Sequence, residues 1–275
     1  KSRTAPGFCL MANAYFLALR QAGLQERILE LADSVSGADA RELEEVAGRI
    51  QGLFKELPLP AAVEEELRQG YEKLVGGKAE VKVAVRSSAT AEDLPGASFA
   101  GQLESFLNLE TWEQVKEAVI ACWASLWSPR AMHYRLQKNL PHDQVGMAVI
   151  IQKMVPARVA GVMFTANPVT GSRRELYIEA VAGLADRLVQ GQAAGEIYLF
   201  DKEKNFIISR RFEGDYPLLT DFALRQLAHE GKKLEYLFEE CQDVEWAFYR
   251  DELYILQTRP ITTLAEEEVQ LPRPE

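Results

Sequence analysis

The chain has 275 residues, of which 47% are hydrophobic and 26% are charged, and its formal net charge is −10. This length can bury one large core or two smaller ones, and the acidic charge argues against a nucleic-acid or membrane surface as partner. No apolar run reaches the ~18 residues of a membrane span and no signal peptide is visible, while the scattered Cys9, Cys122 and Cys241 fit neither a disulfide framework nor a zinc site, which predicts a cytoplasmic location.

Residues 8–76 are predicted to be mostly helical. Apolar residues recur at helical spacing over 41–54, prolines interrupt the pattern at Pro58 and Pro60, and the pattern resumes over 61–74. Residues 81–85 alternate between apolar and polar and predict a strand, which a polar, glycine-containing stretch follows as far as Gly101. Helices are expected again over about 111–139.

Strands dominate the second half. They are expected at 146–154, 159–164, 175–181, 196–200 and 205–211. One amphipathic helix, about 221–240, is expected to begin after Thr220 as N-cap and to bury the stripe Leu224, Leu227, Leu234 and Leu237. This clustering predicts an α+β protein with an N-terminal lobe over residues 1–140 and a C-terminal lobe over residues 141–275.

The last strand pair carries the strongest chemical signal. Asp243 and Glu245 lie two residues apart in an apolar run, and Gln257 and Arg259 lie two apart in the returning strand after a turn at 250–252. Residues two apart on a strand share a face, so this hairpin could hold a divalent metal and a polyphosphate. The alternative is a solvated strand face on which the carboxylates form salt bridges with Arg259.

Two further segments could contact a nucleotide. Arg86 is expected to end a strand ahead of a loop of small hydroxyl residues and glycines, a combination suited to phosphate. The alternative is a plain connector in which Arg86 pairs with Glu92 or Asp93. Over residues 146–168, two apolar strands flank a short connection at 155–158 that could cover a purine ring, or could be an ordinary buried hairpin.

Together these segments resemble one family. The anchors are Pro6-Gly-Phe, Val85-Arg-Ser-Ser-Ala, Phe99-Ala-Gly-Gln, Gln152-Lys-Met-Val, Gly161-Val-Met-Phe-Thr-Ala-Asn-Pro, Glu245-Trp-Ala and Leu256-Gln-Thr-Arg-Pro-Ile-Thr. In these the chain resembles the N-terminal nucleotide-binding domain of phosphoenolpyruvate synthase, pyruvate phosphate dikinase and the rifampicin phosphotransferases. The resemblance implies an ATP-grasp fold whose two lobes hold MgATP in the cleft between them. It also implies an ATP-dependent phosphotransferase that phosphorylates a histidine on a swivelling domain, for onward transfer to pyruvate or to an antibiotic such as rifampicin.

The resemblance also assigns roles to individual residues. It implies phosphate contacts for Arg86, Gly101, Ser105, Gln257 and Arg259. It places Gln152 beside the adenine, and it implies that Met154 and Val155 form the hinge whose backbone lies next to the adenine. Glu245 is implied as the metal ligand, supported by Asp243 and Gln257, and the catalytic set is Arg86, Glu245 and Arg259.

Three departures from the family pattern leave an alternative open. The family's Gly-Gly-Lys-Gly segment is not seen before Pro6, its Gly-Leu-Gly-Glu stands here as Gly183-Leu-Ala-Asp, and the segment 191–219 looks short. The phosphohistidine and acceptor domains are also expected to lie outside this chain. A non-catalytic nucleotide-binding or regulatory module of the same fold is therefore the second hypothesis.

Overall fold

The chain divides into two compact units. The computed structural model describes residues 2–35, 39–77, 80–90, 104–189, 191, 194–261 and 264. One unit, here called the helical unit, is Pro6–Met154, and the other, the sheet unit, combines Lys1–Ala5 with Val155–Glu275. The expected lobe boundary at residue 140 was wrong, because strand β5 (Met147–Lys153) pairs with β2 (Gly7–Leu10) and β3 (Val83–Ala89) inside the helical unit.

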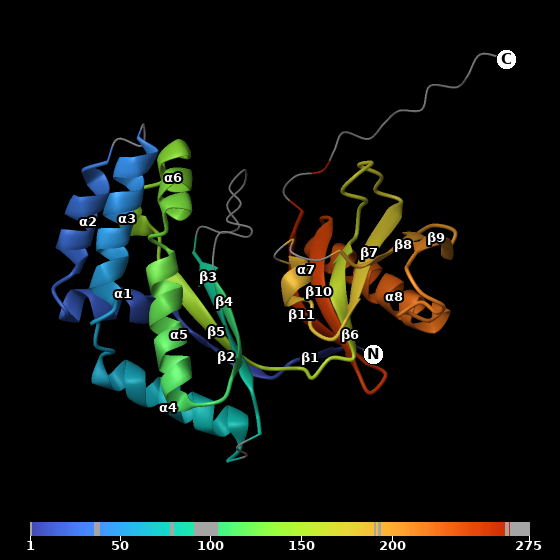
Figure 1. Ribbon diagram of the computed structural model, residues 1–275, viewed down its shortest axis with the longest axis horizontal. Coiled ribbons are helices and arrows are strands. Elements are labelled where there is room, and N and C mark those ends of the chain that lie inside the picture. The colour runs from blue at the N-terminus through green and yellow to red at the C-terminus, as the bar shows by residue number, and fades with distance from the viewer. Residues whose placement is uncertain are drawn as a thin grey trace. The chain divides into compact units, whose positions relative to one another are not determined.

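The helical unit packs two layers of helices on one face of a small sheet. The sheet has the order β2-β5-β3-β4, with β4 at Ser105–Leu109. Helices α1 (Ala12–Gln21), α4 (Ala61–Val75) and α5 (Trp112–Ser125) contact its strands, as Figure 1 shows. Helices α2 (Gln25–Asp33), α3 (Ala40–Phe54) and α6 (Pro129–Gln137) pack on this layer or on each other, and a 3-10 turn covers His142–Gln144.

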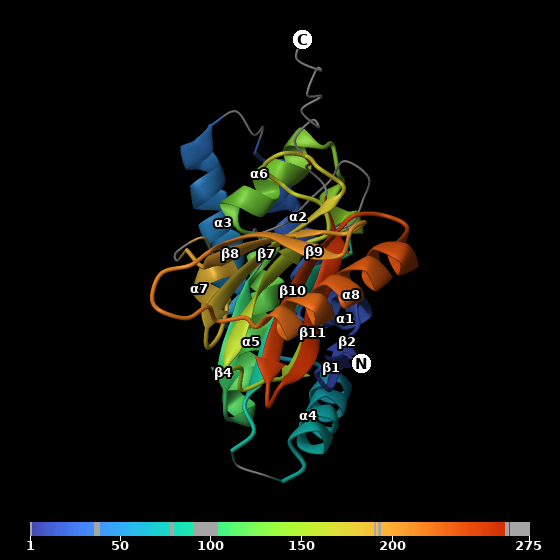
Figure 2. The same ribbon diagram turned by 90° about the vertical axis from the view of Figure 1, so that its right-hand side faces the viewer.

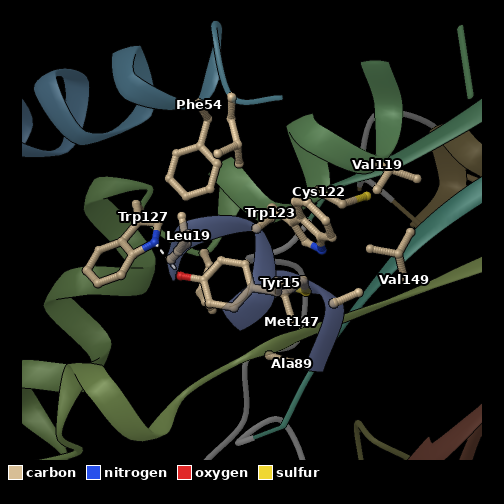
Figure 3. Close-up of a cluster of buried hydrophobic side chains, with 14 of the residues drawn as sticks. Tyr15, Leu19, Phe54, Ala89, Val119, Cys122, Trp123, Trp127, Met147 and Val149 are labelled. Atoms are coloured by element: carbon tan, nitrogen blue, oxygen red, sulfur yellow. Dashed lines mark hydrogen bonds between the residues drawn. The ribbon is translucent and has the colours of Figure 1, made fainter. Parts of the chain in front are cut away.

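The core of the helical unit is aromatic. Tyr15 lies at its centre, its ring 6.0 Å from that of Trp123 in an edge-on contact and 6.4 Å from that of Phe54 in a stacked one. The Tyr15 hydroxyl accepts a 2.9 Å hydrogen bond from Nε1 of Trp127 (Figure 3). This bond gives the buried indole N–H of Trp127 an acceptor inside the core.

A buried arginine closes the same core. Nε of Arg135 donates to Nδ1 of His142 at 2.9 Å, Nη1 donates to the Leu126 carbonyl at 2.6 Å, and the guanidinium lies 4.8 Å from the Trp127 ring centre. Burial, together with the positive charge of Arg135, lowers the pKa of His142 to about 4. His142 is therefore a neutral hydrogen-bond acceptor with a structural role.

Acid is expected to destabilise the helical unit through His142. The pKa in the folded chain is about 4 against an ordinary 6.5. Neutral His142 therefore makes its full contribution to the free energy of unfolding above pH ~6.5. That contribution is lost as the pH falls toward 4, by up to about 1.4 kcal/mol per pH unit. Urea unfolding at several pH values should show this slope for the wild-type chain and a shallower one for His142→Asn, which keeps an acceptor near Nδ1. His133→Asn, at an exposed position, is the matched control, and an unchanged slope in His142→Asn contradicts the prediction.

The sheet unit is built on a seven-stranded sheet of order β1-β11-β10-β6-β7-β8-β9. The strand bounds are β1 Arg3–Thr4, β6 Val159–Phe164, β7 Glu175–Ala182, β8 Glu196–Asp201, β9 Phe206–Arg211, β10 Gln242–Tyr249 and β11 Glu252–Pro260. Its helices within the described residues are α7, Asp186–Val189, and α8, Asp221–Phe238. Every strand predicted from residue 146 onward is present within one or two residues of its expected bounds.

Helix α8 covers one face of this sheet. It contacts β10 and β6, and Figure 2 shows it running across the strands. Thr220 is its N-cap, as expected, and accepts a 3.2 Å hydrogen bond from the Ala223 N–H. Leu224 and Leu227 are fully buried, but the predicted stripe was wrong at Leu237, which is 66% exposed because the helix end runs past the core. Among the described residues, no helix combines the length and the apolar character needed to cross a membrane.

Candidate functional site

A β-bulge sets the geometry of the closing hairpin. Arg250 and Asp251 both have positive φ angles, 50° and 62°, as a two-residue turn of the type I′ kind requires. From this turn the pairing runs regularly to Trp246 opposite Ile255, and then Glu245 pairs with Gln257, so that one residue of β11, Leu256, is extra. The bulge moves the rest of β11 by one position relative to β10.

This shift brings the four predicted hairpin residues onto one face. Asp243 pairs with Arg259 and Glu245 with Gln257, and directly paired residues point to the same side of a sheet. Their neighbours on β10, Val244, Trp246 and Phe248, point the other way into the core beneath α8. Trp246 is fully buried and serves packing.

The ion pair that the alternative hypothesis expected is present. One Asp243 oxygen, Oδ2, lies 2.8 Å from Nε and 2.7 Å from Nη2 of Arg259. Burial raises the pKa of Asp243 above its usual range, Arg259 opposes that rise, and the nearby charge of Glu245 adds to it. Burial and the neighbouring carboxylate both make the negative charge of Asp243 costly, and a cation bound between the two acids would offset that cost.

The same face carries an acid that sequence reasoning missed. Val162 of β6 pairs with Glu245 on one side and with Glu179 of β7 on the other. Glu179 therefore lies in the same cross-strand row as Glu245, and its Oε1 accepts a 2.9 Å hydrogen bond from the Gly195 N–H. The alternation of polar and apolar residues along 175–181 was the available signal, and it was used only to predict a strand.

In the helical unit, three other predicted residues share a face of the four-stranded sheet. Arg86 pairs with Ser105 on β4 and with Ile150 on β5, and Gln152 lies two residues beyond Ile150. The alternate residues of β5, including Val149 and Ile151, are buried in the core beneath the helices. Arg86, Ser105 and Gln152 therefore lie on the face that the core helices leave uncovered.

The position of Arg86 corrects one expectation. It was predicted to end a strand, but β3 continues to Ala89, so Arg86 lies in the middle of a strand paired on both sides. Its two cross-strand partners, Ser105 and Ile150, hold its backbone more firmly than a strand end would and fix where its side chain leaves the sheet. Gly101, Glu92 and Asp93, the other residues named for this region, lie outside the described residues.

The expected hinge backbone is partly engaged within the chain. The Met154 N–H donates to the Lys82 carbonyl at 2.9 Å, and the Val155 carbonyl accepts from the Ala157 N–H at 2.7 Å. The apolar Val155 side chain packs with Ala5, Ala160 and Ala247 on the same side of the large sheet as Glu245. The Met154 N–H and the Val155 carbonyl are thus engaged within the chain. A purine edge could be recognised here through the Met154 carbonyl and the Val155 N–H.

The donor set fits a magnesium–phosphate ligand. No cluster of three histidine, cysteine or acidic side chains suited to a metal occurs in the part of the chain that the structure describes. The hairpin instead offers two carboxylates and one amide, which leaves further positions to phosphate oxygens and water, as Mg²⁺ prefers. Guanidinium groups, Arg86 in one unit and Arg259 in the other, are the side chains best suited to bind phosphate oxygens.

The chain is similar to proteins of one known family. Residues 2–215 and 213–273 match the family model described as pyruvate phosphate dikinase, AMP/ATP-binding domain. A probable phosphoenolpyruvate synthase of Pyrococcus abyssi is 38% identical over 88% of this chain and 34% of its own length. Rifampicin phosphotransferase of Bacillus subtilis is 36% identical over 94% of this chain and 32% of its own length.

Among solved structures, D-alanyl-alanine synthetase A from Vibrio cholerae aligns with 73% of this chain and 46% of its own chain, with a TM-score of 0.33 and 11% identity. That similarity is too small to support an argument. The two sequence relatives are informative, and this chain spans about a third of the length of each.

Proposed function

The chain belongs to the family of pyruvate phosphate dikinase AMP/ATP-binding domains, and from this premise we propose that it binds MgATP through the residues described above. Membership of this family implies the ATP-grasp fold, and the α+β architecture agrees with that fold. Arg86 and Ser105 of the helical unit bind phosphate oxygens, as does Gly101 of the segment outside the described residues. Gln152, Met154 and Val155 contact the adenine.

The hairpin supplies the other half of the ligand set. Glu245 holds Mg²⁺, with Asp243 and Gln257 in support, and Arg259 binds phosphate while it restrains Asp243. When bound, Mg²⁺ neutralises the phosphate charge that builds up during transfer. The observation that carries this proposal is the bulge at Leu256, which places all four polar side chains on one face of the sheet.

We further propose that the bound ATP phosphorylates a histidine on a separate swivelling domain, which passes the phosphoryl group to pyruvate or to an antibiotic. The relatives named phosphoenolpyruvate synthase and rifampicin phosphotransferase are about three times as long as the matched region, so there is room in them for such domains. Within this chain, Arg86, Glu245 and Arg259 are the proposed catalytic residues, because phosphoryl transfer depends mainly on positioning and charge neutralisation. The cytoplasmic location stays a prediction.

A second candidate function is a nucleotide-binding module without catalysis. The Asp243–Arg259 ion pair favours it, because it engages two of the proposed ligands with each other. The two candidates separate when the chain is mixed with MgATP and the histidine domain of a relative. Phosphohistidine formation supports the first, and ATP binding without any transfer supports the second.

Calorimetric titration with MgATP tests the binding proposal. Arg86→Ala is expected to lose about 2 kcal/mol of binding free energy, roughly a thirtyfold weaker affinity, because a charge-assisted contact to phosphate is removed. Arg41→Ala, an exposed arginine at the start of α3 in the same unit, is the matched control and should bind like the wild-type chain. Wild-type affinity in a folded Arg86→Ala chain would rule out the proposed role.

A further inference from the structure

The N-terminal residues of the chain join the sheet unit, apart from the rest of the first half. Strand β1 is the outermost strand of the seven-stranded sheet and runs parallel to β11. Arg3 pairs with Tyr254 and Thr4 with Ile255, the two residues that precede the bulge residue Leu256. β1 therefore covers the outer edge of β11 just ahead of the point where its pairing with β10 shifts.

A buried glutamate on α8 holds the start of this segment. Glu230 is only 6% exposed, and its carboxylate accepts hydrogen bonds from both the hydroxyl and the backbone N–H of Ser2. Ser2, Glu230 and Leu253 line the same pocket, which places this contact beside the start of β11. Hydrogen bonds to an ionised acceptor are about twice as strong as neutral ones, so this contact can hold a strand of two residues in place.

The carboxylate of Glu230 is ionised in spite of its burial. Burial acts to raise its pKa, but the hydrogen bonds from Ser2 and the positive charge of Lys233 outweigh burial and lower the pKa below its usual range. Nζ of Lys233 lies 3.4 Å from Oε2 of Glu230, and the lysine side chain is 61% exposed, so water screens that pair. Ser2 is therefore the partner on which the buried carboxylate mainly depends.

The other contacts of the segment differ in strength. Arg3 forms an ion pair with Glu252, but both side chains are exposed, at 59% and 43%, so this pair adds little. Ala5 is buried and packs with Val155 and Ala160. The segment is thus anchored at Ser2 and at Ala5, with β1 between the two anchors, and loss of the Arg3 pair alone leaves it in place.

The position of the bulge determines where β11 bends. The extra residue could be accommodated closer to the turn if Tyr254 and Ile255 moved along β10, and β11 would then no longer bend beside Gln257. A strand with a single neighbour is only weakly fixed in register, whereas a strand paired on both sides cannot slip without breaking both sets of hydrogen bonds. Pairing with β1 therefore keeps the extra residue at Leu256, next to Gln257.

We propose that Ser2 and Glu230 are positioning residues for the MgATP site: they hold β1 against β11 and thereby fix the bulge that places Gln257 opposite Glu245. This inference rests on the proposed function of the hairpin. Glu230 belongs to α8, which covers the face of the sheet opposite to Glu245 and Gln257, so it acts on the ligand set only through the strands.

Amide hydrogen exchange tests the hold on β11 without any nucleotide. In Glu230→Ala the amides of Tyr254, Ile255 and Leu256 should exchange about tenfold faster than in the wild-type chain or more, because a charge-assisted contact is lost. Ser2→Ala keeps the backbone N–H and should show a smaller increase, about threefold. Glu230→Gln keeps an acceptor oxygen and should lie between Glu230→Ala and the wild-type chain.

Nucleotide binding separates a positioning role from a purely structural one. Mg²⁺ should strengthen ATP binding in the wild-type chain, and in Glu230→Ala this gain should fall by about tenfold, because Gln257 is no longer held opposite Glu245. Binding of ATP without Mg²⁺ should change little. Glu235→Ala, which removes another carboxylate of α8 that pairs with Lys202, is the matched control and should behave like the wild-type chain in both measurements.

Three results would overturn the positioning role: wild-type exchange of β11 in a folded Glu230→Ala chain, an equal change in Glu235→Ala, or faster exchange of β11 with an unchanged effect of Mg²⁺. Should Glu230→Ala fail to fold, Ser2→Ala decides, and wild-type exchange together with a wild-type effect of Mg²⁺ in Ser2→Ala overturns the inference. A wild-type chain that does not bind MgATP would instead refute the proposed function, and the exchange measurement would still decide whether Glu230 holds β1 against β11.

Discussion

Replacing Glu245 with glutamine is expected to lower phosphoryl transfer to the histidine domain by about 100-fold or more, an effect typical of removing one group that stabilises developing charge. Glutamine keeps the size of the side chain and removes its negative charge. Asp243 is already paired with Arg259, so it cannot fully replace the lost carboxylate. The measurement is phosphohistidine formation with MgATP, together with the Kd for ATP in the presence and absence of Mg²⁺.

The binding experiment separates metal binding from a structural role. In the wild-type chain Mg²⁺ should strengthen ATP binding, and in Glu245→Gln this dependence should largely disappear. Glu252→Gln is the matched control on the same hairpin, where the glutamate pairs with Arg3 rather than facing Gln257. An unchanged Mg²⁺ dependence in Glu245→Gln would show that the metal is held elsewhere.

Replacing Gly161 with alanine is expected to destabilise the sheet unit by about 3 kcal/mol, the upper part of the usual range for an overpacked core. An added Cβ would overlap the Glu179 carbonyl oxygen and would come within 2.7 Å of the Trp246 ring. The first of these is backbone in the neighbouring strand, so it cannot move aside without disturbing the pairing of β6 with β7. Amide hydrogen exchange within β6 and β7 should report the lost protection directly.

The same substitution at Gly48 is the control. Gly48 lies in α3, and nothing is within 4 Å of a Cβ added there. Gly48→Ala is therefore expected to be neutral or to stabilise the helix by up to about 1 kcal/mol, because alanine has the higher helix propensity. Unchanged exchange in Gly161→Ala would contradict the prediction, because it would show that β6 and β7 accommodate the added Cβ without losing their pairing.

Period-two patterns in the sequence were sufficient for the strands from residue 146 onward and for grouping the four hairpin residues, whereas β2 and β4 were not predicted. Asp243 with Glu245, and Gln257 with Arg259, could each be assigned to a common face because alternation along one strand is a local property. The N-cap at Thr220 was likewise predictable, since a threonine ahead of an amphipathic run satisfies the free N–H groups within a few residues. Each of these inferences depends on neighbours along the chain.

Pairing between strands was not predictable in the same way. From a two-residue turn at 250–251, regular pairing would place Glu245 opposite Leu256 and would turn Gln257 toward the core with Val244. The bulge at Leu256 reverses this and joins the two polar pairs on one face. The pair of Trp246 with Ile255 lies between the turn and the bulge, so it is the same in both registers and does not indicate the shift. Beyond it β10 also pairs with β6, a segment distant in sequence, and such contacts cannot be derived from local alternation.

The sequence by itself determined the α+β class, the strands and the long helix of the second half, the family resemblance and the residue types of a magnesium–phosphate site. Only the tertiary structure decided that the unit boundary follows Met154, that Arg86 lies within a strand rather than at its end, and that Glu179 lies in the row of Glu245. The physical reason is that propensity, capping and alternation act between near neighbours. Strand order and register are instead set by the free energy of burying side chains from segments far apart in the chain.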